Sequence, residues 1–179
     1  DQPTLWPYKK INLGLDLQGG MHLVLQVDLA KAVESTVDRS FDDLRAFLRQ
    51  NHIRPKALSR IDATTFAVSL ADLEKFSESK GMLAEEFRDY TLDEKELEGD
   101  RALYLTLKSA EAENIKRLAF EKAIMKVRNR VDEYGAREPE IRPQGEDRVV
   151  VQLPGVIDAE RARKEIGRTG HLEFKLVDD

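Results

Sequence analysis

The sequence predicts an α+β fold made of two tandem ferredoxin-like (βαββαβ) units with antiparallel sheets. Several short segments alternate apolar with polar residues, as half-buried strands do. Longer segments place apolar residues three and four positions apart, as amphipathic helices do. The complete order of these elements occurs a second time along the chain, which indicates an internal duplication of a split βαβ motif.

The first predicted unit covers residues 21–88. In order, its elements are a strand (21–27), a helix capped by Asp28 and ended by Asn51, two hairpin strands (56–61 and 65–70), a helix (72–80) closed by Gly81, and a strand (82–87). The long helix carries an apolar stripe, which gives it one face to bury. Asp at its start and Asn or Gly after helices are the residues that ordinarily occupy those positions.

The second predicted unit covers residues 102–179 and repeats this order. Its elements are a strand around 103–107, a long helix from Ser109 to Gly135, a strand (148–153), a helix from Asp158 to Gly167, and a strand around 172–176. The offset between equivalent positions grows from 81 (Asp28 to Ser109) to 86 (Asp72 to Asp158), as loop insertions would produce.

Two segments lie outside the predicted units. Residues 1–20 are interpreted as a membrane-proximal lead-in that ends in a Gly-Gly turn. Residues 89–101 are interpreted as an acidic linker, because their charged composition can bury little apolar surface. The alternative is one continuous domain in which this second segment forms an acidic surface helix.

The composition of the chain excludes or disfavours several classes of function. Of 179 residues, 41% are hydrophobic and 35% are charged, and no apolar run approaches the roughly 20 residues of a membrane span. The first residue is Asp and no signal-peptide pattern follows it, so we expect an excised piece whose membrane anchor lies outside it. A net charge of -5 disfavours nucleic acid as a partner. The absence of cysteine excludes disulfides and thiolate nucleophiles.

No pattern in the sequence predicts an enzyme, a cofactor or a metal. The three histidines lack the spacing that places two ligands on one helix face. Residues 14–20 contain three glycines but lack the Lys-Ser/Thr pair of a phosphate loop. The basic residues of the second long helix share it with acidic ones, which favours a solvated face over an RNA-binding one. We therefore predict a binding or structural module.

The predicted sheets offer one candidate surface. Both helices of a βαββαβ unit pack on one face of its sheet, so the opposite face stays open. A half-polar open face suits contact with another domain or with an extended polypeptide. The residues that we assign to this candidate polypeptide-contact face are Thr65, Ser69, Tyr104, Thr106 and Gln152. The alternative is a solvated face without a partner.

Three stretches of the chain resemble the SecD family of protein-export membrane proteins. They are residues 13–28, with Leu-Gly-Leu-Asp-Leu-Gln-Gly-Gly at their start; residues 127–155, with Arg-Val-Val-Val-Gln-Leu-Pro-Gly at their end; and residues 166–176. The motif residues, to which the resemblance gives structural roles, are Gly14, Asp16, Gly19, Gly20, Arg128, Arg130, Gly135, Pro139, Leu153, Pro154, Gly155, Gly167, Glu173 and Phe174.

The resemblance implies a role in protein secretion. SecD-type proteins work with SecF, YajC and the SecYEG channel and use the proton gradient to help an unfolded preprotein cross the membrane. The resembling part is the first extracytoplasmic (periplasmic) domain, whose base this chain would form. The implied location is the periplasmic side of the bacterial inner membrane. The alternative function is a regulatory module that binds a small molecule between paired ferredoxin-like units.

Overall fold

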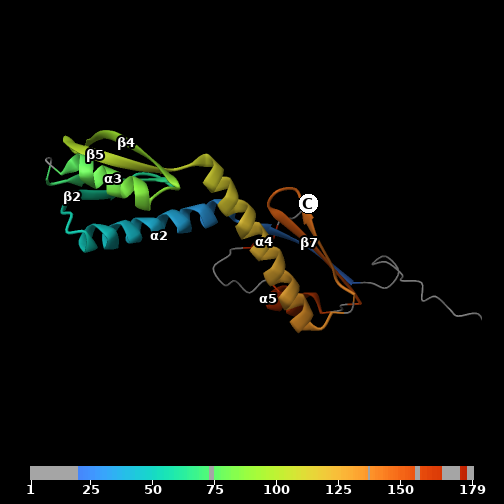
Figure 1. Ribbon diagram of the computed structural model, residues 1–179. Coiled ribbons are helices and arrows are strands. Elements are labelled where there is room, and N and C mark those ends of the chain that lie inside the picture. Colours follow the sequence, from blue (N-terminus) through green and yellow to red (C-terminus); the bar gives the residue numbers. More distant parts are fainter. Residues whose placement is uncertain (1–19, 73–74, 137, 156–157, 167–173, 177–179) are drawn as a thin grey trace, which may run out of the picture. The chain divides into compact units, whose positions relative to one another are not determined.

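The computed structural model describes residues 20–72, 75–136, 138–155, 158–166 and 174–176 (Figure 1). Five motif residues, namely Gly14, Asp16, Gly19, Gly167 and Glu173, lie outside the described residues. The helices and strands fall into two compact units, one built from residues 1–27 and 122–179 and the other from residues 28–121. We call them unit 1 and unit 2. Unit 2 is therefore inserted into the chain of unit 1.

Unit 2 contains one four-stranded sheet and the helices that pack on it. Its elements are α2 (Leu29–Gln50), β2 (Pro55–Arg60), β3 (Thr65–Leu70), α3 (Phe76–Glu86), β4 (Tyr90–Leu97), β5 (Asp100–Leu107) and the first half of α4 (Ser109–Tyr134). The strands lie in the order β2-β3-β5-β4, and each neighbouring pair is antiparallel. The Asp28 side chain accepts a hydrogen bond from the Lys31 backbone N–H at 2.9 Å, which confirms the predicted cap of α2.

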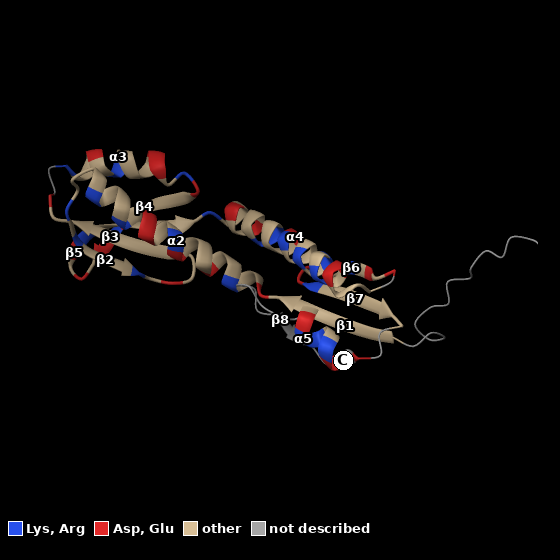
Figure 2. Cartoon of the chain, turned by 90° about the horizontal axis from the view of Figure 1, so that it is seen from below, with Lys and Arg blue, Asp and Glu red and all other residues tan. Residues whose placement is uncertain are grey.

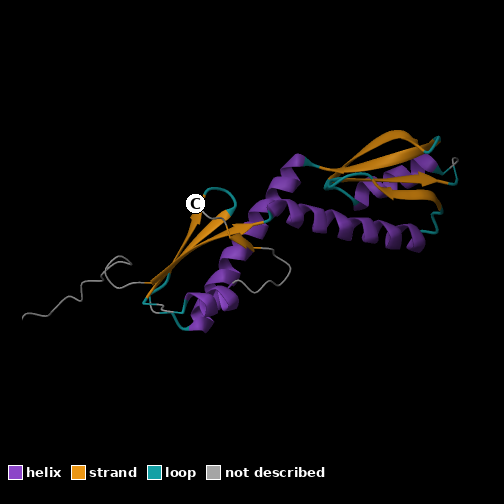
Figure 3. Ribbon diagram, turned by 180° about the vertical axis from the view of Figure 1, so that it is seen from behind, coloured by secondary structure: helices purple, strands orange, loops and turns teal. Residues whose placement is uncertain are grey.

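The core of unit 2 lies between one sheet face and the helices α2 and α3 (Figure 3). Its largest fully buried side chains are Leu44, Leu48, Phe66, Phe76, Leu83, Leu103 and Leu105. These residues alternate along β3 and β5 and recur at spacings of four and seven along the helices, so the sequence pattern identified the buried faces correctly.

Unit 1 contains the second sheet. Its elements are β1 (Gly20–Val27), the second half of α4, β6 (Glu140–Gln144), β7 (Arg148–Pro154), α5 (Ala159–Ile166) and β8 (Phe174–Leu176). The strand order is β6-β7-β1-β8, again with antiparallel neighbours. Its core joins β1 and β7 to both helices, through the buried residues Met21, Leu23, Leu25, Val27, Val127, Val131, Val149, Val151, Leu153, Ala162 and Ile166. The α+β class and the antiparallel sheets are thus confirmed.

The two predicted repeats have exchanged their first strands. The hairpin and last strand of the second repeat (β6, β7 and β8) enclose β1, which opens the first repeat. In the same way, β2 and β3 of the first repeat, together with β4 from the segment between the repeats, enclose β5, which opens the second. The predicted tandem boundaries at 21–88 and 102–179 are therefore corrected to a nested arrangement. Alternation along a strand identifies its buried face but carries no information about its partner.

Three predictions about residues 72–101 are wrong. The helix predicted to close at Gly81 continues to Glu86, so the strand predicted at 82–87 is absent and its residues are helical up to the C-cap Phe87. Burial of Phe76 and Leu83 offsets the roughly 1 kcal/mol that glycine costs inside a helix. The predicted acidic linker contains β4, which hydrogen-bonds to β5 from Tyr90 to Leu97. Only Tyr90 of this strand is buried, and residues 93–96 are charged and exposed, as suits an edge strand that resists further pairing.

Candidate functional site: the outer sheet faces

The outer face of the unit 2 sheet is the face that α2 and α3 leave uncovered. On its two central strands Thr65 opposes Thr106, and Ala67 opposes Tyr104. These residues alternate with Phe66, Leu103 and Leu105 of the core, so the four predicted contact residues of β3 and β5 share this face. Alternation predicted an outer-face position for each of these residues, Thr65 and Ser69 in the first unit and Tyr104 and Thr106 in the second; the pairing of β3 with β5 brings all four together on one face.

Small side chains occupy the centre of the outer face. Ala67, Ser69 and Ala102 are fully buried although no helix of unit 2 lies over them, and Thr65 is only 7% exposed. The Ser69 hydroxyl accepts a hydrogen bond from the Ala57 backbone N–H at 3.0 Å. Of the predicted contact residues on this sheet, Tyr104 and Thr106 therefore carry the accessible surface.

Tyr104 and the threonines give the outer face its chemistry. The Tyr104 hydroxyl donates to the Glu96 carbonyl at 3.1 Å, and Lys95 Nζ lies 5.2 Å from the centre of the ring. The hydroxyls of Thr65 and Thr106 are 3.2 Å apart, and the Thr91 hydroxyl donates to the Thr106 carbonyl at 3.2 Å. The face thus combines a fixed aromatic ring with a row of hydroxyls at the edge strand.

Gln152 lies in the other sheet. It opposes His22 on one side and Glu140 on the other, on the face of the unit 1 sheet that α4 and α5 leave uncovered. Gln26 Nε2 on the same face donates to Asp147 Oδ2 at 2.7 Å. The predicted contact residues therefore divide between two sheets, one in each unit.

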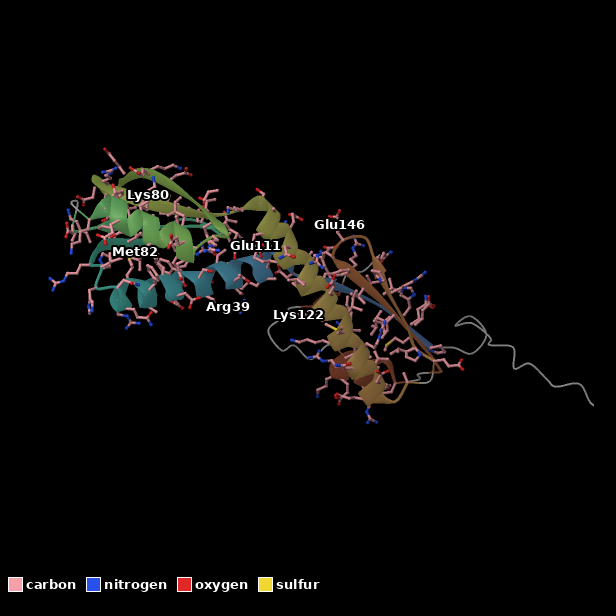
Figure 4. All side chains as sticks on the ribbon, in the orientation of Figure 1. Arg39, Lys80, Met82, Glu111, Lys122 and Glu146 are labelled. Carbon is pink, nitrogen blue, oxygen red and sulfur yellow. The ribbon has the colours of Figure 1, made fainter. Side chains whose placement is uncertain are left out.

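Charged side chains pair on the helix side of the unit 2 sheet, opposite the outer face, and along α4. Lys80 of α3 (labelled in Figure 4) pairs through Nζ with Glu94 of β4, and Arg101 Nη2 of β5 pairs with the same carboxylate, each at 2.6 Å. Hydrogen bonds from Lys80 and then Arg101 lower the pKa of the Glu94 carboxyl. On α4 acidic and basic residues are interleaved (Figure 2), with ion pairs between Lys116 and Glu113 and between Arg117 and Glu121. This mixture does not form the basic stripe typical of nucleic-acid binding.

The motif residues of unit 1 meet where β1 begins. Gly20 pairs with Pro154, and a β-carbon at Gly20 would lie 2.6 Å from the Leu153 carbonyl oxygen. Gly155 follows with a φ of 72°, a conformation that favours glycine. The Gly-Gly motif and the Leu-Pro-Gly motif are thus in direct backbone contact, although more than 130 residues separate them in the sequence.

Two further motif residues end helices. Gly135 follows α4 with a φ of 79°, which confirms the predicted left-handed helix stop. Arg130 Nη1 donates to the carbonyl of Ile166, the last residue of α5, at 2.9 Å. A cation at this end also complements the helix dipole. Leu153 is fully buried, Pro139 is half-buried and Arg128 is exposed, while Phe174 pairs with Val27 in β8.

Pattern reasoning missed a pocket of about 360 Å³ in unit 2, lined by residues of α2 and of the turn between α3 and β4. Its residues are far apart in sequence and belong to no motif. Within the described ranges, no group of three His, Cys, Asp or Glu side chains is arranged to hold a metal ion. None of the described helices combines the length and apolarity required to cross a membrane.

Comparison with known proteins identifies relatives for both units. The family model "Protein translocase subunit SecDF, P1 domain, N-terminal" matches residues 120–179, and the model "SecD/SecF GG Motif" matches residues 9–28. Protein translocase subunit SecD from Syntrophobacter fumaroxidans is 42% identical over 96% of this chain and 32% of the relative. The SecD proteins of Pseudomonas aeruginosa and Escherichia coli K12 are 34% and 31% identical, each over 93% of this chain and 27% of the relative.

The chain spans about a third of the length of these curated relatives. The two family models match it in the order in which the motifs occur, and their matched segments coincide closely with the two chain segments of unit 1. With relatives aligned over nearly all of its residues, the chain belongs to the SecD family of protein translocase subunits.

Proposed function

We propose that this chain is a non-catalytic module on the periplasmic side of a SecD-type translocase subunit, where it contacts unfolded preprotein in transit. Its relatives bear the name protein translocase subunit SecD, and the matching family model describes a P1 domain. Assistance to translocation requires reversible contact with a polypeptide rather than bond chemistry. The observation that carries the proposal is the outer face of unit 2, which exposes hydroxyls and an aromatic ring beside an edge strand.

The nested arrangement supports a division of roles between the units. Both family models fall on unit 1, in which β1 pairs with β7 and Gly20 lies directly against the backbone of Leu153. Unit 2 is inserted between those segments and carries the outer face with Tyr104 and Thr106. We assign the role of base to unit 1 and the role of contact module to unit 2.

The chemistry of the outer face fits a partner of variable sequence. Hydroxyl groups donate and accept hydrogen bonds, so Thr106 and Thr91 can bond to the backbone of any extended chain. The Tyr104 ring offers apolar area at a low entropy cost, because its hydroxyl is already bonded to Glu96. Ala67 and Ala102 are fully buried, so the contact falls on the accessible surface of Tyr104, Thr106 and Thr91. Weak, sequence-tolerant contact is the expected result.

The wider assembly belongs to this proposal as well. SecF, YajC and the SecYEG channel are the proposed partners, and the proton gradient is the proposed energy source. The chain corresponds to about a third of its relatives, so contacts with these partners and the proton path are assigned to the remaining segments of such proteins.

Photocrosslinking from the outer face tests the proposal. The chain replaces the matching segment of Escherichia coli SecD, and a photoreactive residue stands at Thr106 while export of a preprotein is arrested. The control position is Asp42, whose side chain is 71% exposed on α2, the helix that packs on the opposite face of the sheet. Preprotein crosslinks from position 106 but not 42 are expected. Crosslinks from position 106 to translocase subunits alone would contradict polypeptide contact and indicate a scaffold.

A further inference from the structure

The pocket of unit 2 lies on the helix side, where α2 faces the turn from α3 into β4. Residues that line it are Ser40, Asp43, Ala46, Phe47, Gln50, Glu86, Phe87, Asp89 and Tyr90. Its volume of about 360 Å³ is sufficient for a long side chain together with part of its backbone. All of its lining belongs to unit 2.

The wall of the pocket is aromatic. Phe47 and Phe87 meet edge to face with ring centres 6.1 Å apart, and Phe87 meets Tyr90 in the same way at 6.2 Å. Such a wall accepts the methylene stem of a long side chain. It also attracts a cation placed over a ring face.

The polar groups of the pocket are predominantly acidic. Asp43, Glu86 and Asp89 are exposed at the pocket, and in the described part of the chain their carboxylates have no cationic partner. Other carboxylates of unit 2 do have one, since Glu94 pairs with Lys80 and Asp38 with Arg60. Three carboxylates without an ion-pair partner at one pocket favour a positively charged ligand.

Tyr90 provides an independent indication of a ligand. The residue is only 6% exposed, and its hydroxyl is buried without a hydrogen-bond partner among the described residues. A buried polar group without a partner costs stability and requires an explanation. Burial raises the pKa of Tyr90, whereas the Ser40 side chain, as a nearby hydrogen-bonding group, and the charge of Arg60, which is paired with Asp38, lower it. The Tyr90 oxygen can accept a hydrogen bond from a ligand if its own proton turns toward Ser40.

We propose that this pocket binds a lysine or arginine side chain of an extended polypeptide. The ammonium or guanidinium group lies among the carboxylates of Asp43, Glu86 and Asp89 and donates to the Tyr90 oxygen. The methylene stem packs against Phe47 and Phe87.

The identity of the partner as a polypeptide rests on the proposed function, and the path of the chain supports it. Tyr90 faces the pocket, whereas the next residue, Thr91, faces the outer side and bonds to Thr106. Because β4 is the edge strand, a polypeptide that passes around this edge reaches both surfaces. A basic side chain anchored in the pocket would then place its backbone near the hydroxyls of the outer face.

Peptide titration of the whole 179-residue chain tests the inference. Two blocked peptides are compared, Ala-Ala-Arg-Ala-Ala and the same peptide with neutral citrulline in place of arginine, and binding is followed by the amide NMR signals of Phe47, Phe87 and Tyr90. The arginine peptide is expected to shift these signals saturably. The citrulline peptide is expected to bind about tenfold more weakly, because it loses its charge-assisted hydrogen bonds. Equal binding of both peptides overturns the inference.

Neighbouring glutamates on α3 provide the matched variants. Glu86 lines the pocket and Glu85 does not, and both side chains are exposed, so neither Glu86→Gln nor Glu85→Gln is expected to unfold the chain. We expect Glu86→Gln to weaken the arginine peptide several-fold and Glu85→Gln to leave it unchanged. Equal loss in both variants would indicate a general charge effect and overturn the pocket assignment.

A third ligand separates a polypeptide site from a site for small cations. Agmatine carries the guanidinium group without a peptide backbone, and it is expected to bind more weakly than the arginine peptide. Agmatine binding as tight as the peptide would overturn the polypeptide partner. Peptide binding in the pocket without preprotein crosslinks from Thr106 would overturn the proposed function alone, and crosslinks without peptide binding would overturn this inference alone.

Discussion

Gly20 and Leu153 approach each other so closely that no other residue type fits at position 20. An added β-carbon would lie 2.6 Å from the Leu153 carbonyl oxygen and 3.0 Å from the Pro154 Cα. Both contacts are with backbone atoms, which cannot rotate away. The Gly-Gly motif therefore has a packing role: it lets β1 begin directly beside the end of β7.

Substitution of Gly20 by alanine should destabilise unit 1 more than the same substitution at Gly155. Both residues have positive φ, which costs a non-glycine residue about 1–2 kcal/mol, but only Gly20 has atoms within 4 Å of its missing β-carbon. We expect Gly20→Ala to cost about 1–3 kcal/mol more than Gly155→Ala, because the backbone must shift. Urea unfolding measures both variants, and equal losses would argue against the close contact.

Alanine at Gly135 and alanine at Gly81 should act in opposite directions. Gly135 has a φ of 79° after α4, so Gly135→Ala should destabilise the chain by about 1–2 kcal/mol. Gly81 lies inside α3 with open space around its Cα, so Gly81→Ala should stabilise it by about 0.5–1 kcal/mol. Thermal unfolding distinguishes the two. Destabilisation by Gly81→Ala would indicate that α3 ends at this glycine, as the sequence first predicted.

The ion pairs of Glu94 should stabilise unit 2 at neutral pH and not in acid. Its hydrogen bonds to Lys80 and Arg101 lower the pKa from its ordinary value of 4.5, so the folded state binds the proton less readily than the unfolded state. This contribution is present above pH 4.5 and disappears as pH falls through the lowered value. The difference in urea midpoint between the chain and its Glu94→Gln variant should therefore shrink from pH 7 to pH 3. A difference that is the same at both pH values would contradict the pairing.

The sequence determined the faces of the elements more reliably than their partners. Alternation placed Thr106 on the outer face and Leu105 in the core, and the caps at Asp28 and Gly135 were predicted correctly. These are local properties. The exchange of β1 and β5 is not a local property. Both strands alternate apolar with polar residues and precede a long helix, so the sequence pattern does not distinguish which of the two sheets each one enters.

Part of the candidate surfaces could be predicted for the same reason. Alternation gave Thr65, Ser69, Tyr104 and Thr106 outer-face positions, but their position on one common face depends on the pairing of β3 with β5, and the burial of Ser69 results from packing by its neighbours. Gln152 was predicted in the same unit as Tyr104 and Thr106, but β7 pairs with β1 and Gln152 therefore lies in the other sheet. The pocket around Tyr90 could not be predicted from the sequence, because it depends on how α2 packs beside the turn that precedes β4.

Unit 2 should fold by itself as residues 28–121, since this segment is continuous and contains a complete sheet with its core. Residues 21–88, the unit first predicted from the sequence, should not fold. They lack β4 and β5, and β5 is the neighbour of β3 in the sheet, so Phe66 and Val68 would lose most of their packing. Circular dichroism and thermal unfolding of both fragments test this. A cooperative transition in 21–88 and none in 28–121 would support the tandem arrangement instead.

The pairing of β1 with β7 is the central claim, because it makes unit 2 an insertion, and a cysteine pair tests it most directly. The chain has no cysteine of its own, so any intramolecular disulfide must join the introduced residues. His22 opposes Gln152, and opposed residues of antiparallel strands have Cα atoms about 4.5–5.5 Å apart, within disulfide range. We predict that His22→Cys with Gln152→Cys forms an intramolecular disulfide readily, whereas His22→Cys with Ser69→Cys does not. A disulfide between positions 22 and 69, and none between 22 and 152, would contradict the exchange of first strands.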